Sequence, residues 1–163
     1  MTRKCLTLLT VLFFVLSGQL WAAGSKKKED TGDKAHAHYN RGIDLTAEGD
    51  FAGARAEFEK ALEIKEEFAE AHNNLGYVLR RQGPDNFDAA LNHYNRALEL
   101  NSKLAEAYMY RGVLHTLAGD EAAAKKDHEA LAGIDREMAD QLMQVIASGE
   151  EPAGTAGLAA KWE

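Results

Sequence analysis

Apolar and small residues recur along most of this chain at intervals of three and four, the spacing that places side chains on one face of an α-helix. After residue 50, for example, Ala54, Phe58 and Ala61 follow one another at i, i+4 and i+7. The pair Gly49-Asp50 interrupts the pattern just before this segment and indicates a turn. No strand pattern is evident, so the sequence predicts an all-α fold built from short amphipathic helices.

The helical pattern is repeated three times. When Ala35 is placed over Ala69 and Ala105, the starts of the units are 34 and 36 residues apart. Glycine recurs at two fixed places in every unit, and the matching residues are Gly42, Gly76 and Gly112, then Gly49, Gly83 and Gly119. The two extra residues of the second unit fit as Pro84-Asp85, in the turn after Gly83. Each unit predicts one pair of helices, over residues 35–68, 69–104 and 105–135.

The first glycine of each unit falls inside a predicted helix, where glycine costs about 1 kcal/mol relative to alanine. A sequence that repeats this cost at Gly42, Gly76 and Gly112 indicates that the bare backbone lets a neighbouring helix approach closely. The same interpretation applies to Ala54 and Ala90, which recur in the second predicted helix of their units. Close packing between helices is therefore expected at these positions.

The repeated pattern resembles the tetratricopeptide repeat, whose order over 34 residues is a large residue, Leu-Gly, Tyr, Ala, an aromatic, Ala and Pro. The second unit supplies this order as His72, Leu75-Gly76, Leu79, Ala90, Tyr94 and Ala97. The first unit supplies it as His38, Arg41-Gly42, Leu45, Ala54, Phe58 and Ala61. The closing proline position departs from the family and holds Glu66 and Ser102. The resemblance implies a right-handed α-solenoid of three repeats.

A further amphipathic stretch follows the third unit. Met138, Leu142 and Val145-Ile146 lie at helical spacing, which predicts a helix over residues 136–148 that caps the exposed apolar face of the last repeat. The repeat domain is accordingly expected to span residues 35–148. Residues 149–163 are expected to form a flexible tail. In this tail, Trp162 is either an unpacked aromatic residue or a docking handle for a partner.

The N-terminal segment has the order of a secretory signal peptide. Arg3 and Lys4 precede an apolar run of eleven residues, and small residues follow at Ala22-Ala23-Gly24. We predict a signal peptide over residues 1–24, cleaved after Ala22, Ala23 or Gly24, and a polar spacer over residues 25–34. The protein is then exported, to a periplasm or the medium. An uncleaved membrane anchor is the alternative, and membrane contact is expected only in that case.

Charge and cysteine content narrow the range of functions. The chain has 163 residues with 19 Lys and Arg against 26 Asp and Glu, a net charge of −7. This balance argues against binding of nucleic acid, which requires a basic face to neutralise phosphates. The single cysteine, Cys5, cannot form an internal disulfide and excludes multi-cysteine zinc sites.

Catalysis and metal binding are not expected. The predicted mature chain lacks cysteine, and its serines lie in the spacer, at a repeat junction and at a helix end. The six histidines offer no pair at the i, i+4 spacing of a helical zinc site, and His38 and His72 occupy the same packing position of successive repeats. We therefore predict a non-catalytic protein without cofactor, metal or small-molecule substrate.

The resemblance implies a binding groove lined by the first helices of successive repeats. Transferring the family's groove positions onto this sequence gives Tyr39, Asn40, Ile43, Asn73, Asn74, Tyr77, Arg80, Arg81, Met109, Tyr110 and Val113. Asn74 matches a position whose amide commonly holds a peptide backbone, because an amide both donates and accepts. Tyrosines suit interface anchors, and the arginines suit an acidic group.

One specialised groove of the family is not expected here. Its clamp for the C-terminal carboxylates of heat-shock chaperones uses Lys and Asn in the first unit, and Lys and Arg in the third. The matching positions in this chain are Tyr39, Ile43, Glu106 and Tyr110. The leading hypothesis is therefore an exported, non-catalytic adaptor that binds another protein or peptide in its groove. The alternatives are a structural subunit of an envelope assembly, joined through outer faces or the capping helix, and a metal-dependent enzyme that uses histidines.

Overall fold

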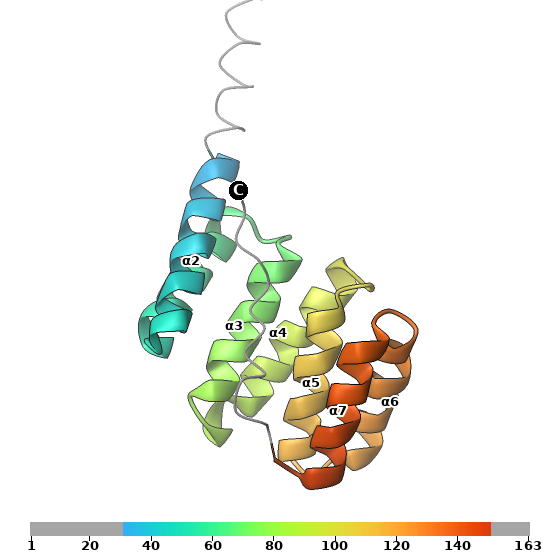
Figure 1. Ribbon diagram of the computed structural model, residues 1–163. Coiled ribbons are helices and arrows are strands. Elements are labelled where there is room, and N and C mark those ends of the chain that lie inside the picture. Colours follow the sequence, from blue (N-terminus) through green and yellow to red (C-terminus); the bar gives the residue numbers. More distant parts are fainter. Residues whose placement is uncertain (1–30, 151–163) are drawn as a thin grey trace, which may run out of the picture.

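The computed structural model describes residues 31–150, and these residues form a stack of helices without strands (Figure 1). Residues 31–48 are helical and pair with α2 (Phe51–Ile64). The remaining elements are α3 (Ala69–Arg81), the short 3₁₀ helix η1 (Pro84–Asn86), α4 (Phe87–Leu100), α5 (Ala105–Leu117), α6 (Glu121–Ala132) and α7 (Arg136–Ser148). The prediction of an all-α solenoid is confirmed.

The polar spacer was predicted to end at Lys34, but the helix already includes Thr31. Residues 31–34 therefore extend the first helix by about one turn, because a polar residue on an exposed helix face is compatible with helix formation. The predicted signal peptide, most of the spacer and the tail after Glu150 lie outside the described residues. Within the described range, no helix combines the length and the apolar character needed to cross a membrane.

Three helices begin at an aspartate that caps them. The carboxylates of Asp50, Asp120 and Asp135 accept hydrogen bonds of 2.9, 3.0 and 3.0 Å from backbone N–H groups three residues on. Each satisfies a donor that the first helical turn leaves without a partner. Gly49 and Gly119 stand just before two of these caps with φ of 83° and 80°, values that favour glycine. The Gly-Asp pairs therefore set the turn between the two helices of a repeat.

The helical glycines lie at the tightest contacts of the stack. A Cβ on Gly42 would lie 2.6 Å from the ring of Phe58, and one on Gly76 would lie 2.8 Å from the ring of Tyr94. The third repeat has His128 where the others have this aromatic, and there Gly112 faces Leu142 of α7, whose Cδ2 would lie 2.6 Å from an added Cβ. Thus α7 fills the space that the degenerate third repeat leaves.

The stack is curved. Helices α3, α5 and α7 contact one another in succession, whereas α2, α4 and α6 make no mutual contacts among the described elements. The side formed by residues 31–48, α3, α5 and α7 is therefore the inner one, and we call it the inner face. Because one helix separates each of α3, α5 and α7 from the next, these three run in the same direction (Figure 1).

Candidate functional site

The predicted groove residues lie in the first helices, but the structure buries most of them. Asn40 is half-buried and Arg81 is exposed. The others are at most 7% exposed, and they are Tyr39, Ile43, Asn73, Asn74, Tyr77, Arg80, Met109, Tyr110 and Val113. Several of them are packed against neighbouring repeats. The set therefore stabilises the stack of helices as well as forming part of the inner face.

Three polar side chains form a chain of hydrogen bonds on the inner face. The Asn74 amide nitrogen donates to the Tyr39 hydroxyl at 3.0 Å, and the Asn73 amide nitrogen donates to the Asn74 amide oxygen at 3.1 Å. Both asparagines are fully buried. Burial raises the pKa of Tyr39 above its ordinary value, against the opposing effect of the Asn74 hydrogen bond, so the hydroxyl stays protonated.

This series of hydrogen bonds ends at the side-chain oxygen of Asn73, an acceptor without a donor. Among the described residues, nothing hydrogen-bonds to the side-chain oxygen of Asn73. A buried amide oxygen without a donor costs about 1–3 kcal/mol, and such atoms are rare in folded proteins. Asn73 therefore holds an unsatisfied acceptor within the packed inner face, to which an N–H group would hydrogen-bond once the residue is uncovered.

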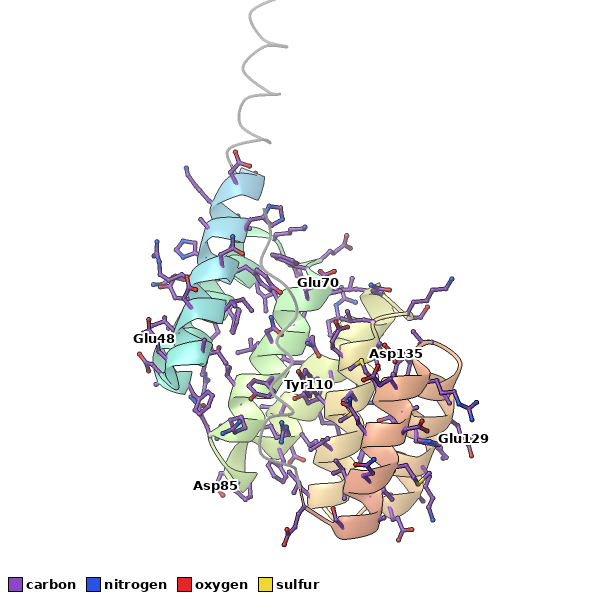
Figure 2. All side chains as sticks on the ribbon, in the orientation of Figure 1. Glu48, Glu70, Asp85, Tyr110, Glu129 and Asp135 are labelled. Carbon is purple, nitrogen blue, oxygen red and sulfur yellow. The ribbon has the colours of Figure 1, made fainter. Side chains whose placement is uncertain are left out.

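Aromatic rings and guanidinium groups lie next to the asparagines. The rings of Tyr77 and Tyr110 are 5.1 Å apart between centroids, and Tyr110 lies near the middle of the inner face (Figure 2). Arg81 donates a 2.8 Å hydrogen bond to the Tyr77 hydroxyl, and the guanidinium of Arg80 lies 5.4 Å from the centre of the Tyr77 ring. Aromatic and cationic groups in this arrangement bind rings and acidic groups well.

A second set of polar contacts joins the two helices of every repeat through equivalent residues of the second helices, Glu57, His93 and Asp127. In the first repeat, His38 Nδ1 and Glu57 Oε2 are 2.7 Å apart. In the second, His72 Nδ1 and His93 Nδ1 are 3.0 Å apart. In the third, the equivalent acidic residue is Asp127, which is bound by Arg111 at 2.6 Å. We call these contacts the three ties.

The three ties differ in the charges that their side chains carry. Burial disfavours ionised Glu57, but hydrogen bonds from His38 and Lys60 outweigh it and hold the Glu57 pKa below its ordinary value. The middle tie has no acid, and burial lowers the pKa of both its histidines, that of His93 to about 4. Since His72 Nε2 lies 3.0 Å from the Glu66 carbonyl oxygen, it carries the proton, and His72 Nδ1 accepts from His93 Nδ1–H.

Ligand spacing along one helix does not predict the contact of His72 with His93, because the two residues lie on different helices. The signal lay in the repeat alignment, where the partners are equivalent to His38 and Glu57. Two imidazoles do not make a metal centre by themselves, and within residues 31–150 no three His, Cys, Asp or Glu side chains converge. The pair therefore serves as a helix-to-helix contact.

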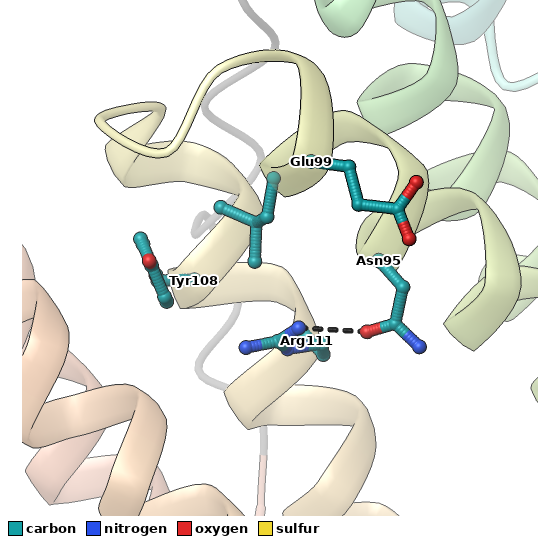
Figure 3. Close-up of a pocket in the computed structure, with 5 residues that line it drawn as sticks. Asn95, Glu99, Tyr108 and Arg111 are labelled. Atoms are coloured by element: carbon teal, nitrogen blue, oxygen red, sulfur yellow. Dashed lines mark hydrogen bonds between the residues drawn. The ribbon is translucent and has the colours of Figure 1, made fainter.

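A shallow pocket of about 400 Å³ opens where α4 meets α5 (Figure 3). Its lining residues are Asn95, Leu98, Glu99, Tyr108 and Arg111. Arg111 donates to the Asn95 side-chain oxygen at 2.7 Å and to both oxygens of Asp127. Because these contacts occupy the guanidinium, the pocket is better suited to fixing α4, α5 and α6 together than to binding a ligand.

The repeats match a known family of repeat proteins. A family model described as "TPR repeat" matches residues 42–83 and 85–119. The structure is similar to the first TPR domain of Spaghetti (RPAP3) bound to the HSP90 peptide SRMEEVD, with a TM-score of 0.66 and 21% identity. That match covers 72% of this chain and 93% of the other.

Two further structures share the fold. The Arabidopsis OM64 TPR domain matches with a TM-score of 0.67 and 13% identity, over 74% of this chain and 99% of that chain. The TPR2AB domain of yeast Sti1, in its complex with pHSP90, matches with a TM-score of 0.66 and 18% identity. The latter match covers 84% of this chain and 56% of that one.

Proposed function

Because this chain is a tetratricopeptide-repeat protein, we propose that it is a non-catalytic adaptor that binds a peptide segment of another protein on its inner face, in an exported compartment. The observation that carries the proposal is the buried Asn73 oxygen, which has no donor within residues 31–150, beside Asn74 and the Tyr77 ring. An extended peptide supplies backbone N–H groups for such an acceptor and side chains for the aromatic surface.

The structural neighbours favour a peptide as the ligand class, since the RPAP3 domain is bound to an HSP90 peptide. The inner face of this chain favours a different peptide. At the positions of the family's carboxylate clamp it has Tyr39, Ile43 and Tyr110, which are buried, together with half-buried Glu106. Three aromatic and apolar side chains and one acid thus stand at the clamp positions in place of lysine, asparagine and arginine. We infer that the peptide is recognised through apolar side chains and backbone hydrogen bonds.

Export is supported by the sequence alone. The basic start, the apolar run of eleven residues and the small residues that follow have the order of a signal peptide. Detection of the mature N-terminus by mass spectrometry of protein recovered from outside the cytoplasm tests this part of the proposal. A chain that keeps residues 1–24 in the cytoplasm contradicts it.

The binding site is tested by substitution after partners have been identified by co-purification and mass spectrometry. We expect Asn74→Ala and Tyr77→Ala to weaken the captured complex, and Asn73→Leu to weaken it while preserving side-chain volume. Asn92→Leu, an equivalent change at an exposed position of α4, serves as the matched control. Each variant is first shown to be folded by thermal denaturation. Partner binding that persists unchanged in the folded inner-face variants contradicts the proposed site.

A second candidate function is a structural subunit joined through the capping helix. Ile134 and Met143, which lie before and within α7, are 40% and 38% exposed although both are large apolar residues. An exposed apolar residue on α7, with a second one just before this helix, favours a contact with another protein. Native mass measurement distinguishes the two functions: a hetero-complex broken by Met143→Glu supports the subunit, and a monomer that binds peptide supports the adaptor.

A further inference from the structure

The side of α3 that belongs to the inner face is fully buried, although no described helix beyond the stack packs on it. On α3, His72 and Gly76 face α4, where they contact His93 and Tyr94. The opposite side of α3 presents Asn73, Asn74 and Tyr77 to the inner face, yet these three residues are at most 1% exposed. Every residue from Ala71 to Arg80 is buried. A helix that is buried on all sides needs cover on all sides.

We propose that the C-terminal segment of this same chain, residues 151–163, docks on the inner face and occupies the site of the partner peptide. The proposal rests on the proposed function, because it concerns the same surface. Under it, the adaptor is self-inhibited, and a partner binds by displacing the segment.

The segment begins at the edge of this surface. Helix α7 ends at Ser148, and Gly149 turns the chain with φ of 71°. Glu70 and Asp135 lie at one end of the stack, where α3 and α7 begin, and Asp85 lies at the opposite end (Figure 2). The chain therefore leaves α7 at the end of the inner face where α3 and α5 also finish.

The segment is long enough to cover the site. Thirteen extended residues span at most about 43 Å. Crossing from α7 past α5 to α3 takes about 20 Å at ordinary helix spacings. Running back along α3 to Asn73 takes about 12 Å at 1.5 Å per residue. The segment thus reaches Asn73 with residues to spare.

The composition of the segment suits an extended ligand. Its sequence is EPAGTAGLAAKWE, in which Pro152, Gly154 and Gly157 disfavour a helix. Small residues predominate, and the two large apolar side chains are Leu158 and Trp162. An indole ring packs well on tyrosines, and its N–H is a donor of the kind that the Asn73 oxygen lacks.

Charge and linkage also favour the segment. It carries two acidic residues and one lysine, and the end of α3 carries Arg80 and Arg81. A ligand joined to its site by a short linker acts at an effective concentration of about millimolar. Even a weak contact is therefore occupied much of the time, and a partner has to compete with it.

Fluorescence of the full chain tests the docking directly. Of the two tryptophans, Trp21 lies in the proposed signal peptide, so Trp21→Phe leaves Trp162 as the sole reporter whether or not that peptide is cleaved. We expect blue-shifted emission and protection from acrylamide, both lost in Tyr77→Ala and kept in the control Asn92→Ala. Emission like that of a solvent-exposed indole, or an emission that ignores Tyr77→Ala, overturns the proposal.

Binding in trans provides a second test that does not depend on the inner-face variant. A labelled synthetic peptide of residues 151–163 is titrated into the full chain and into Leu158→Ser/Trp162→Ser. We expect about tenfold tighter binding to the double variant, because its own segment no longer competes. Equal binding to both chains, or binding to neither, overturns the proposal.

The two proposals fail separately. A partner can bind the full chain and Leu158→Ser/Trp162→Ser with equal affinity while Trp162 is solvent-exposed. That result contradicts self-inhibition and leaves the adaptor function. Conversely, the Trp162 emission can change in Tyr77→Ala while neither the full chain nor Leu158→Ser/Trp162→Ser binds any co-purified partner. That result contradicts the adaptor function and leaves the docking of the segment.

Discussion

The side-chain amide of Asn74 donates a 3.0 Å hydrogen bond to the hydroxyl of Tyr39, across 35 residues of sequence. This bond joins the first helices of two successive repeats at the inner face. Tyr39→Phe removes the acceptor but keeps the ring, and leaves a buried amide N–H without its partner. We expect the free energy of unfolding to fall by about 1–3 kcal/mol, measured by urea denaturation.

A tyrosine on another face provides the control for this prediction. The hydroxyl of Tyr108 lies 3.4 Å from the Ser102 carbonyl oxygen, in an exposed contact. Tyr108→Phe is expected to change stability by less than about 0.5 kcal/mol. Equal effects of the two substitutions would show that the Asn74 contact has no special weight.

The helical glycines allow a prediction with opposite signs at two positions. A Cβ on Gly76 would meet the Tyr94 ring at 2.8 Å and the Ala90 carbonyl oxygen at 3.1 Å, so Gly76→Ala has to displace packed atoms. We expect a loss of about 1–3 kcal/mol. Gly32 is also helical but has open space around it, and Gly32→Ala is expected to raise stability by up to about 1 kcal/mol. Thermal denaturation of both variants measures the contrast.

The tie of the third repeat is expected to depend on both partners. The Asp127 side chain is 5% exposed and is held by Arg111. Arg111→Met leaves a nearly buried carboxylate without its main partner, and we expect a loss of about 3 kcal/mol. Adding Asp127→Leu should restore part of that stability, which a double-mutant cycle measures.

The exposed pair Arg55–Glu59 is the reference for that cycle. Its side chains are 44% and 46% exposed and four residues apart on α2. Its coupling energy is expected to stay within about 0.5 kcal/mol. A coupling in the third tie no larger than this would contradict a structural role for Arg111.

The middle tie predicts a dependence of stability on pH. Burial lowers the His93 pKa from 6.5 to about 4, so between these values the unfolded chain binds more protons than the folded one. Stability therefore rises with pH across this window and is lost as the pH falls from about 6.5 toward 4. His93 is partly solvent-exposed, so we expect a change of about 1–2 kcal/mol after allowance for screening.

His93→Gln isolates this contribution, because it keeps a hydrogen-bonding side chain without a titrating group near neutral pH. Charges of both signs face the pair, including Glu59, Arg55 and Arg96, and they remain in the variant. Denaturant unfolding at several pH values should give a flatter profile for the variant between pH 4 and 6.5. Parallel profiles for the two chains would contradict the assignment.

The sequence predicted the helices because their signal is local. Three- and four-residue spacing, Gly-Asp turns and the repeated glycines specify each helix from its own residues. Contacts between helices were harder to predict. The partners His72 and His93 are 21 residues apart, and the contact of Gly112 with Leu142 crosses from the third repeat to the capping helix. Such contacts depend on how a repeat is completed, which residue spacing within one helix does not encode.

The candidate site shows the same limit. Repeat position predicted that Asn73 and Asn74 lie on the inner face, since the family fixes that register. It did not predict that both would be fully buried, nor that one amide oxygen would lack a donor. Those properties depend on what else covers the face, and helical periodicity describes only one helix at a time.

The unequal chemistry of the three ties has a mechanical consequence. In a linear array each module is supported only by its neighbours, so the weakest junction decides where the array yields. Protonation of the buried histidines would loosen the contact between α3 and α4, which is the one of the three ties that contains no carboxylate. Acidification would thus create a hinge between α3 and α4, inside the second repeat, and a bound peptide that contacts both sides of this hinge would be released there.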